Sequence, residues 1–455
     1  MTKSSNKRQT AAVVLAAGQG TRMKSGLPKV LHPLAGRPMI CHLLDSIEKA
    51  GIEKIIVVGP DNNKISDVIG PYSTVAQVEQ LGTGHAVMQA SEFLEGFEGD
   101  IMVLFGGDPL ITPETLNAIL GRRRADDAPS VVVLGFNSRS PGLYGRLITN
   151  SEGVLESIVE AKEASAAQLN IQLCNSGVMC VDGAQLFGLL EAVKNDNAQG
   201  EYYLTDIVGL ARAKGLRCAI VEGSEDELIG IDDRKDLARA EQVIQDRLRS
   251  RAMEGGATLL DPKSIYFSYD TELGHDVPVG PNVVLGPAVT VANNVTIRPF
   301  CHIEGTKISE GAIIGPFARL RPGSTLAEDV SVGNFVEIKN AKLEKGVKIN
   351  HLTYIGDARI GARANVGAGT ITCNYDGVSK HFTDIDAGAF IGSNSALIAP
   401  IKIGEGAIIG AGSTITKDVP PGSLAITRIK QQNHLGLAAK IRKATRNTRN
   451  KKGAG

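Results

Sequence analysis

A six-residue repeat of aliphatic side chains runs through the second half of this 455-residue chain. A six-residue unit can place one aliphatic side chain inward and turn at small residues, so that stacked coils bury a continuous aliphatic column. A narrow prism of this kind has little room for large rings, and aromatic residues make up only 4% of the chain. The repeat therefore predicts a solenoid of hexapeptide units. Three series carry it: Val279, Leu285, Val291, Ile297 and Ile303; Ile314, Leu320, Leu326, Val332 and Ile338; Ile391, Leu397, Ile403, Ile409 and Ile415.

The spacing is interrupted between residues 338 and 360, where we expect a functional loop. The last residues, "KIRKATRNTRNKKGAG", are basic and polar without aromatics. They favour a disordered, solvated tail over the alternative of a nucleic-acid-binding arm.

The chain up to about residue 234 follows a different pattern. Short apolar runs such as "AVVLAAG", "KIIVVGP", "DIMVLFG" and "SVVVLGF" alternate with helix-length segments. Strands that are apolar on both faces and separated by helices indicate parallel strands in an α/β fold, with ligands bound at their carboxyl ends. The charged segment that follows reads as a connecting helix. We expect three parts: a domain over 1–234, a linker helix over 235–255, and the repeat domain with its tail over 256–455.

Overall composition excludes several classes of function. Lys plus Arg and Asp plus Glu both total 49, so no general attraction to nucleic acid or to a membrane follows. No signal peptide and no run of about 18 apolar residues is present, which predicts no stable membrane association. The six cysteines are scattered without C-x-x-C pairing, which argues against a zinc site or a disulfide framework and favours a reducing cytoplasm.

A glycine-rich turn, "LAAGQGTRMKSGLPKVL" (15–31), directly follows the first apolar run. Glycines let backbone amides approach phosphate oxygens, while Arg22 and Lys29 can neutralise a polyphosphate and its transition state. The third glycine of a dinucleotide fingerprint and the G-K-[ST] of a P-loop are both missing. A turn with a purely structural role is the alternative reading.

The glycine-rich string and several others resemble one family over nearly the whole chain. The further strings are "EQLGTGHA" (79–86), "YGR" (144–146), "IVEAKEA" (158–164), "CNSGV" (174–178) and "GEYYLTDIV" (200–208). With the solenoid, the chain resembles the bacterial bifunctional N-acetylglucosamine-1-phosphate uridylyltransferases/glucosamine-1-phosphate N-acetyltransferases. The resemblance implies a Rossmann-like nucleotidyltransferase domain followed by a left-handed parallel β-helix. It implies acetyl-CoA, UTP, glucosamine-1-phosphate and N-acetylglucosamine-1-phosphate as substrates, with Mg²⁺ as cofactor.

The resemblance assigns residues in the first domain. Arg22 and Lys29 would act on the phosphates. The nucleotide would contact Leu15, Ala16, Ala17, Gly18, Lys29, Phe105, Gly106 and Gly107, with Gln77, Gly82 and Thr83 reading the uracil edge. The N-acetyl sugar would contact Gly145, Glu160, Asn175 and Asp232.

Two departures from the family pattern fall at the metal site. The family has G-D-x-P-L where this chain has "GGDPL", so Gly107 stands at the place of the ligand. The second ligand, an Asn in the family, is Asp232. Adjacent strand residues point to opposite faces, yet two glycines could let the turn re-aim Asp108. We expect Asp108 and Asp232 to hold Mg²⁺; the alternative is that Asp108 caps the helix "TPETLNAIL" or the turn before it.

The second half carries the strings "GPFARLRPG", "VGNFVEIKNA", "NHLTYIGD" and "VGAGTITCNYDG". Acetylating an amine requires a base near neutrality, and His351 is the candidate; a lone His is otherwise more often structural. The resemblance implies a homotrimer with the acetyl site between neighbouring solenoids. It assigns the acetyl acceptor to Arg321, Lys339, Tyr354 and Asn365, and acetyl-CoA to Ala368, Asn374, Tyr375, Ser393, Ala411 and Arg428.

Three readings of function therefore stand. The first is an enzyme that carries out both reactions. The second is an acetyltransferase whose uridylyltransferase half is impaired by the two departures. The third is a noncatalytic, nucleotidyltransferase-like assembly subunit.

Overall fold

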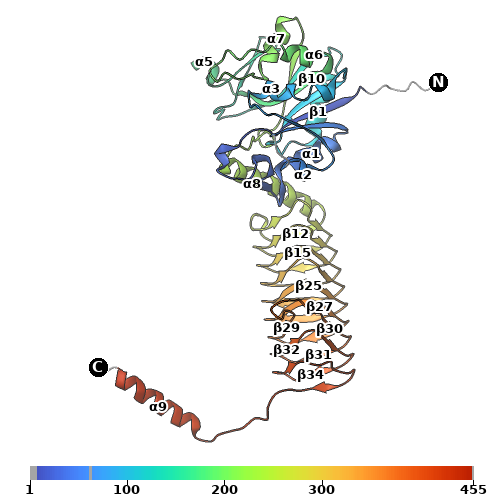
Figure 1. Ribbon diagram of the computed structural model, residues 1–455, viewed down its shortest axis with the longest axis vertical. Coiled ribbons are helices and arrows are strands. Elements are labelled where there is room, and N and C mark those ends of the chain that lie inside the picture. The colour runs from blue at the N-terminus through green and yellow to red at the C-terminus, as the bar shows by residue number, and fades with distance from the viewer. Residues whose placement is uncertain (1–7, 61–63, 453–455) are drawn as a thin grey trace, which may run out of the picture. The chain divides into compact units, whose positions relative to one another are not determined.

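The chain divides into two compact units in the computed structural model, which describes residues 8–60 and 64–452. The first unit runs to Arg251 and includes Phe267–Tyr269. The second comprises Ala252–Tyr266 and the chain from Asp270 onward. Figure 1 shows a layered α/β unit and a stack of short strands. The domain boundaries that the sequence predicts, after residues 234 and 255, stay predictions.

The first unit is built on a mixed sheet of order β11-β7-β10-β6-β1-β4-β5. The four apolar runs form β1, β4, β6 and β7, and the pairs β1–β4 and β1–β6 are parallel as predicted. The sequence did not indicate that β10 runs antiparallel to β6 and β7, or that β8 and β9 form an antiparallel pair beside it. The strands are β1 (Thr10–Leu15), β4 (Lys54–Gly59), β5 (Ser73–Ala76), β6 (Asp100–Phe105), β7 (Val131–Asn137), β8 (Arg146–Thr149), β9 (Leu155–Val159), β10 (Leu173–Asp182) and β11 (Cys218–Glu222), with β2 (Pro33–Leu34) and β3 (Arg37–Pro38) forming a separate pair.

Helices cover both faces of this sheet. Apolar residues of α1 and α4 join one core cluster, and those of α3, α6 and α7 join the other. The central strand β1 contributes alternate residues to both, which is why it is apolar on both faces. The helices are α1 (Met39–Lys49), α2 (Ser66–Ile69), α3 (Thr83–Met88), α4 (Pro113–Arg123), α5 (Ala166–Leu169), α6 (Gly183–Leu190), α7 (Asp206–Ala213) and α8 (Arg234–Glu254).

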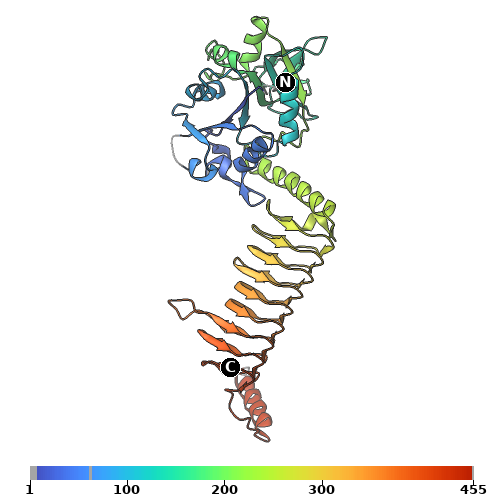
Figure 2. The same cartoon turned by 90° about the vertical axis from the view of Figure 1, so that its right-hand side faces the viewer.

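The second unit is a parallel β-helix with three faces, and Figure 2 shows its strands stacked coil upon coil. The first face consists of β12 (Ala257–Leu259), β15 (Val277–Val279), β18 (Thr296–Ile297), β21 (Ile313–Ile314), β24 (Ser331–Asn334), β26 (Lys348–His351), β28 (Asn365–Val366), β31 (Phe390–Ile391), β34 (Ile408–Ile409) and β36 (Leu424–Ala425). The second consists of β13 (Tyr266–Phe267), β16 (Val284–Leu285), β19 (His302–Ile303), β22 (Arg319–Leu320), β29 (Ile371–Cys373), β32 (Ala396–Ile398) and β35 (Thr414–Ile415). The third consists of β14 (Glu272–Leu273), β17 (Thr290–Val291), β20 (Thr306–Ile308), β23 (Ser324–Leu326), β30 (Thr383–Ile385) and β33 (Ile401–Ile403). Two long strands, β25 (Glu337–Leu343) and β27 (Tyr354–Ile360), run around the corner from the second face to the third.

Every member of the three six-residue series is buried inside this prism. The predicted solenoid is therefore confirmed, and its aliphatic column is the core of the second unit.

The predicted loop between residues 338 and 360 is wrong. Here β25 and β27 pair in parallel with one constant offset from Glu337↔Tyr354 to Leu343↔Ile360. The spacing of buried aliphatic residues does slip to five, from Ile338 to Leu343 and from Ile355 to Ile360, because each strand passes through a corner, where Asn340 and Asp357 adopt positive φ. The interruption lies further on, where residues 374–382 leave the coil and an antiparallel bridge joins Tyr375 to Lys380.

The basic tail also differs from the expectation of disorder, because α9 (Leu437–Lys452) is helical. Its side chains are exposed as far as they are described, to Arg446. All six cysteines are free. Within residues 8–60 and 64–452, no helix has the length and apolar character needed to cross a membrane.

Candidate active sites

A cavity of about 420 Å³ opens at the carboxyl ends of the central strands of the first unit. Most of the residues expected around a nucleotide line this cavity, and Gly106 is the exception. Gly106 lies in the adjoining turn, where its amide donates a hydrogen bond to the Leu15 carbonyl (2.9 Å). The expected residues that line the cavity are Leu15, Ala16, Ala17, Gly18, Arg22, Lys29, Gln77, Gly82, Thr83, Phe105, Gly107 and Asp232.

The glycine-rich turn owes its path to close backbone approaches. Gly20 adopts φ 61°, and a Cβ there would lie 2.7 Å from the Cβ of Lys29. The turn can therefore close onto Lys29 only with glycine at this position. Gln80, which sequence reasoning missed, donates from Nε2 to the Ala17 carbonyl (2.8 Å) and ties the turn to the segment that precedes α3.

The expected base-reading residues lie at the entrance to α3. The Gln77 side chain is buried, and its Nε2 donates to the Gly82 carbonyl (3.2 Å). Gly82 has φ 109°, and a Cβ there would lie 2.7 Å from the Tyr202 carbonyl oxygen. Thr83 Oγ1 accepts from the Leu204 amide (3.0 Å). Backbone contacts from residues 202–204 thus fix the position of the amide groups that would face a base.

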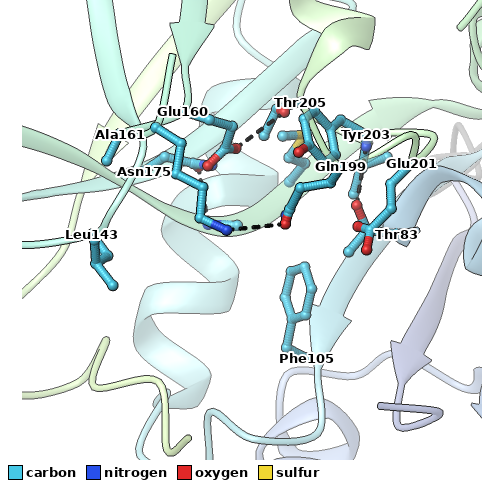
Figure 3. A pocket seen from close by; sticks show the side chains of 14 residues that line it. Thr83, Phe105, Leu143, Glu160, Ala161, Asn175, Gln199, Glu201, Tyr203 and Thr205 are labelled. Atoms are coloured by element: carbon cyan, nitrogen blue, oxygen red, sulfur yellow. Dashed lines mark hydrogen bonds between the residues drawn. The ribbon is translucent and has the colours of Figure 1, made fainter. Parts of the chain in front are cut away.

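A second cavity, of about 260 Å³, shares Thr83, Phe105 and Glu201 with the first, and Figure 3 shows the side chains that line it. Glu160 and Asn175, the expected sugar-binding residues, both line it, and burial raises the pKa of Glu160. A Cβ at Gly145 would lie 3.5 Å from the Glu160 carboxylate oxygens, so the glycine keeps space beside that group. Sequence reasoning assigned no role to the other polar lining residues, although three of them lie in the strings 158–164 and 200–208 that carry the resemblance: Lys162, Gln199, Tyr203 and Thr205.

Asp232 is one of two acidic residues that line the nucleotide cavity, with Glu201 the other. The Asp232 carboxylate accepts from Lys29 Nζ (2.9 Å) and pairs with Arg22 Nη2 (3.0 Å), and it is 42% exposed. Gly107 lines the same cavity, and a Cβ there would lie 3.0 Å from Lys29 Nζ. Position 107 therefore points toward the cationic and acidic cluster.

Asp108 lies in a different environment from Asp232. Its side chain is buried, and a Cβ added at Gly230 would lie 3.5 Å from its Oδ1. Burial raises the pKa of Asp108 to about 7; Lys29 opposes this shift and Asp232 adds to it. The capping reading for α4 is wrong, because Thr112 is the N-cap and its Oγ1 accepts from the Thr115 amide.

An oxygen donor set suited to Mg²⁺ is present at this point, since Mg²⁺ commonly takes one or two carboxylates together with substrate phosphates. Asp232 offers an accessible carboxylate beside the cations of Arg22 and Lys29. Asp108 supplies a second carboxylate that is electrostatically coupled to the first.

In the second unit, one column of residues follows the strands of the first face. His351 lies at the end of β26, and its Nδ1 is 3.0 Å from Asn334 Oδ1 on the coil before. Backbone hydrogen bonds between successive coils continue the column from His351 through Ala368 and Ser393 to Ala411. Arg428 Nη1 donates to the Ala411 carbonyl (2.7 Å). The column therefore brings the candidate base into line with four of the residues expected around acetyl-CoA.

The expected acceptor residues lie on both sides of this column. Tyr354 is on the second face and Asn365 on the first. Arg321 pairs with Glu337 (2.8 Å). Tyr375 begins the projecting hairpin, and its hydroxyl donates to the Gly377 carbonyl (2.6 Å).

Two lysines meet beside a buried carboxylate. Lys339 Nζ is 3.5 Å from Asp357, and it also interacts with Lys380, which sequence reasoning missed because it lies in the hairpin. The contact with Lys339, and then the like charge of that group, lower the pKa of Lys380. Burial alone would raise the pKa of Asp357, but hydrogen bonds from Asn340 and Asn374, with the charge of Lys339, lower it. Two adjacent ammonium groups form a site that favours an anion such as a phosphate.

Comparison with known proteins agrees with both halves. Residues 12–198 match the model of a MobA-like NTP transferase domain, and residues 382–417 match that of the bacterial transferase hexapeptide (six repeats). The bifunctional protein GlmU of Rhodospirillum rubrum is 60% identical over 435 residues, 95% of this chain and 97% of the relative. GlmU of Paramagnetospirillum magneticum is 55% identical over 433 residues, 95% and 96% of the two chains. GlmU of Zymomonas mobilis is 50% identical over 437 residues, 95% and 97%. With this identity over almost its whole length, the chain belongs to the family of bifunctional GlmU proteins.

Proposed function

We infer that the protein catalyses two reactions of UDP-N-acetylglucosamine synthesis. It transfers an acetyl group from acetyl-CoA to glucosamine-1-phosphate, and then transfers a uridylyl group from UTP to N-acetylglucosamine-1-phosphate, releasing pyrophosphate. Membership of the GlmU family supports both activities. The observation that carries the second reaction is the pair of joined cavities, one lined by phosphate-binding residues and the other by Glu160 and Asn175.

In uridylyl transfer, the sugar 1-phosphate attacks the α-phosphate of UTP. The barrier falls mainly through positioning and charge neutralisation, since little covalent chemistry is required of the protein. Arg22 and Lys29 neutralise the phosphates, while Gln77 and Thr83 orient the base. Asp232 and Asp108 would hold Mg²⁺, which would add to the neutralisation of phosphate charge. Glu160 and Asn175 orient the sugar.

In acetyl transfer, His351 takes a proton from the sugar amine as the amine attacks the thioester. The Asn334 oxygen accepts a hydrogen bond from Nδ1–H, which leaves Nε2 unprotonated and able to act as the base. Arg321, Lys339 and Lys380 bind the sugar phosphate. Ala368, Ser393 and Ala411 leave room along the column for acetyl-CoA, with Asn374, Tyr375 and Arg428 around it. We further propose a cytoplasmic homotrimer that binds neither nucleic acid nor, in a stable way, a membrane.

The uridylyl step is tested by Mg²⁺-dependent release of pyrophosphate from UTP and N-acetylglucosamine-1-phosphate. We expect activity in this protein, with no activity in EDTA. The matched comparison is a Gly107→Asp, Asp108→Thr variant, in which the acid stands at the position that faces Lys29. Background activity here together with strong activity in that variant would establish the second reading, an acetyltransferase with an impaired first half.

The acetyl step is tested by transfer from acetyl-CoA to glucosamine-1-phosphate. Because general base catalysis contributes about 10²–10⁴-fold, His351→Ala should lower kcat by a factor in that range while uridylyl transfer stays unchanged. A normal rate in His351→Ala would remove His351 as the base. Absence of both activities in the unmodified protein would favour the noncatalytic reading.

A further inference from the structure

Arg234, the first residue of α8, contacts two separate turns of the glycine-rich segment. Its Nε donates to the Met23 carbonyl (3.1 Å), and its Nη1 lies 3.3 Å from His32 Nδ1. Met23 ends the short 3₁₀ turn η1 (Thr21–Met23), and His32 directly follows a second such turn, η2 (Lys29–Leu31). One guanidinium group therefore joins two turns that are separated along the chain.

Each of these turns carries one of the cations that we place around the phosphates. Arg22 lies in η1, and Lys29 begins η2. Both cations pair with Asp232, two residues before Arg234, at 3.0 Å and 2.9 Å. Arg22, Lys29 and Asp232 line the nucleotide cavity, whereas Arg234 does not. Arg234 therefore lies behind the charged cluster and contacts the backbone or side chain of its supports.

The first turn depends on contacts from outside itself. It is a single turn of three residues between two left-handed residues, Gly20 with φ 61° and Lys24 with φ 48°. This conformation is unfavourable for a residue other than glycine, such as Lys24. The Met23 amide donates to the Gly20 carbonyl (2.9 Å), but a short helix leaves its last carbonyls without partners of its own. The bond from Arg234 satisfies the Met23 carbonyl.

The second turn is held through the buried imidazole of His32. This side chain is only 4% exposed, and its amide donates to the Lys29 carbonyl (3.2 Å). Because a guanidinium group can only donate, Nδ1 must accept and the ring must be neutral. Burial, and then the charge of Arg234, lower the pKa of His32, in agreement with a neutral ring. A planar guanidinium group can serve both turns at once, which the single ammonium group of a lysine cannot do in the same geometry.

The start of α8 supplies the rigid support for these contacts. Asp236 Oδ2 accepts from the amides of Asp232 (3.1 Å) and Asp233 (3.2 Å). In return, Asp233 Oδ1 accepts from the amides of Lys235 (2.7 Å) and Asp236 (3.1 Å). Reciprocal bonds of this kind cap a helix and fix the chain that enters it. The backbone that carries both Asp232 and Arg234 is thereby fixed.

We propose that Arg234 is a positioning residue for uridylyl transfer, which keeps Arg22 and Lys29 in place by its bonds to Met23 and His32. This inference rests on the proposed uridylyl transfer and adds a residue outside the cavity lining. Position matters in this reaction, because charge neutralisation at the phosphates provides most of the rate enhancement. A displacement of about 1 Å can lower such a rate on the order of 10²-fold.

The test compares Arg234→Lys with Arg234→Gln in the full-length protein. The lysine keeps the positive charge but loses the forked donor, whereas the glutamine loses both. The matched control is Arg239→Lys on the same helix, where the guanidinium group lies 3.7 Å from the carboxylates of Glu225 and Asp226. Steady-state kinetics of uridylyl transfer give kcat and KM for UTP. Hydrogen exchange with mass spectrometry measures the amides of residues 20–32 without substrates.

We expect both Arg234 variants to lower kcat about 10- to 100-fold. The KM for UTP should change less than about threefold, because Gln77 and Thr83 would still hold the base. Amides of residues 20–32 should exchange at least about tenfold faster, since the two turns lose their common support. Acetyl transfer should stay unchanged in both variants, and Arg239→Lys should match the unmodified protein in every measurement.

A normal kcat in Arg234→Lys would overturn the proposal, because the charge alone would then suffice. A reduced kcat with unchanged exchange of residues 20–32 would also contradict it, since Arg234 would then act on the substrates directly. If the Arg234 variants unfold, His32→Leu, which removes one of the two acceptors, undergoes the same measurements with the same expected changes. Faster exchange in Arg234→Lys, together with no uridylyl transfer in the unmodified protein, would refute the proposed function and retain the positioning contact.

Discussion

At the scale of single residues, Asp357 connects the two halves of the proposed acetyl site. It lies at a corner with φ 48°, is only 8% exposed, and accepts from Asn340 Nδ2 (2.7 Å) and from Asn374. Its carboxylate also faces Lys339. One buried charge thus positions a residue expected to bind the acceptor and another expected to bind acetyl-CoA.

Asp357→Asn should keep the turn, because asparagine tolerates positive φ. The substitution replaces one carboxylate oxygen, which accepts hydrogen bonds, with an amide NH2 group that faces the donor groups of Asn340 and Asn374. Since a hydrogen bond to a charged group contributes about 1.5–3 kcal/mol, we expect the KM for acetyl-CoA to rise at least tenfold. Steady-state kinetics with each substrate varied will measure this. Asp384→Asn, on the third face beside Arg359, is the control and should leave KM unchanged.

Asp108 gives a prediction about stability and pH. Its folded pKa of about 7 lies above the ordinary 3.8, so its contribution to stability is complete below pH 3.8, declines as pH rises, and is lost above about pH 7. The loss is on the order of 4 kcal/mol. In EDTA, Asp108→Asn should therefore raise the melting temperature more at pH 8 than at pH 5. An equal change at both pH values would contradict the raised pKa.

At the scale of elements, the coils of the β-helix depend on close contact between successive backbones. Gly333 lies in β24, and a Cβ there would lie 2.1 Å from the Asn350 carbonyl oxygen of the next coil. Parallel pairing there aligns Asn334 with His351. The stacking of two coils thereby sets the hydrogen bond that orients the candidate base.

Gly333→Ala should separate β24 from β26, lower the stability of the β-helix by about 2–3 kcal/mol, and reduce acetyl transfer. Uridylyl transfer should stay normal. The comparison is Gly388→Asn, at a corner where φ is 66° and no atom lies within 4 Å of the added Cβ. Calorimetry measures the stability of both variants, and the two assays measure their acetyl and uridylyl transfer. Equal stability and equal acetyl transfer in Gly333→Ala and Gly388→Asn would mean that the close contact between coils is not required for either property.

At the scale of the whole molecule, the two compact units carry separate candidate sites. Each unit has its own core and its own set of proposed catalytic residues. A change in one unit should therefore remove one reaction and leave the other.

His351→Ala should form UDP-N-acetylglucosamine from glucosamine-1-phosphate, acetyl-CoA and UTP about 10²–10⁴-fold more slowly, yet form it normally from N-acetylglucosamine-1-phosphate and UTP. Chromatography of the nucleotide sugar measures both. Loss of product from both starting materials would show that the reactions are not independent.

The sequence by itself determined the class of both units. The six-residue period specifies the β-helix, because each coil must bury one aliphatic residue per face. The runs that are apolar on both faces specify a sheet with helices packed on each side. The glycine-rich turn follows from its local string, and the resemblance of several strings to one family indicated residues around a nucleotide, most of which line the cavity. Only the tertiary structure decided what depends on neighbours far along the chain. It placed Asp108 in a buried pocket while position 107 faces Lys29, moved the interruption of the β-helix to residues 374–382, and brought Lys380 to Lys339. It also aligned three exposed phenylalanines at one corner, because spacing along the chain becomes stacking only after the coils have closed.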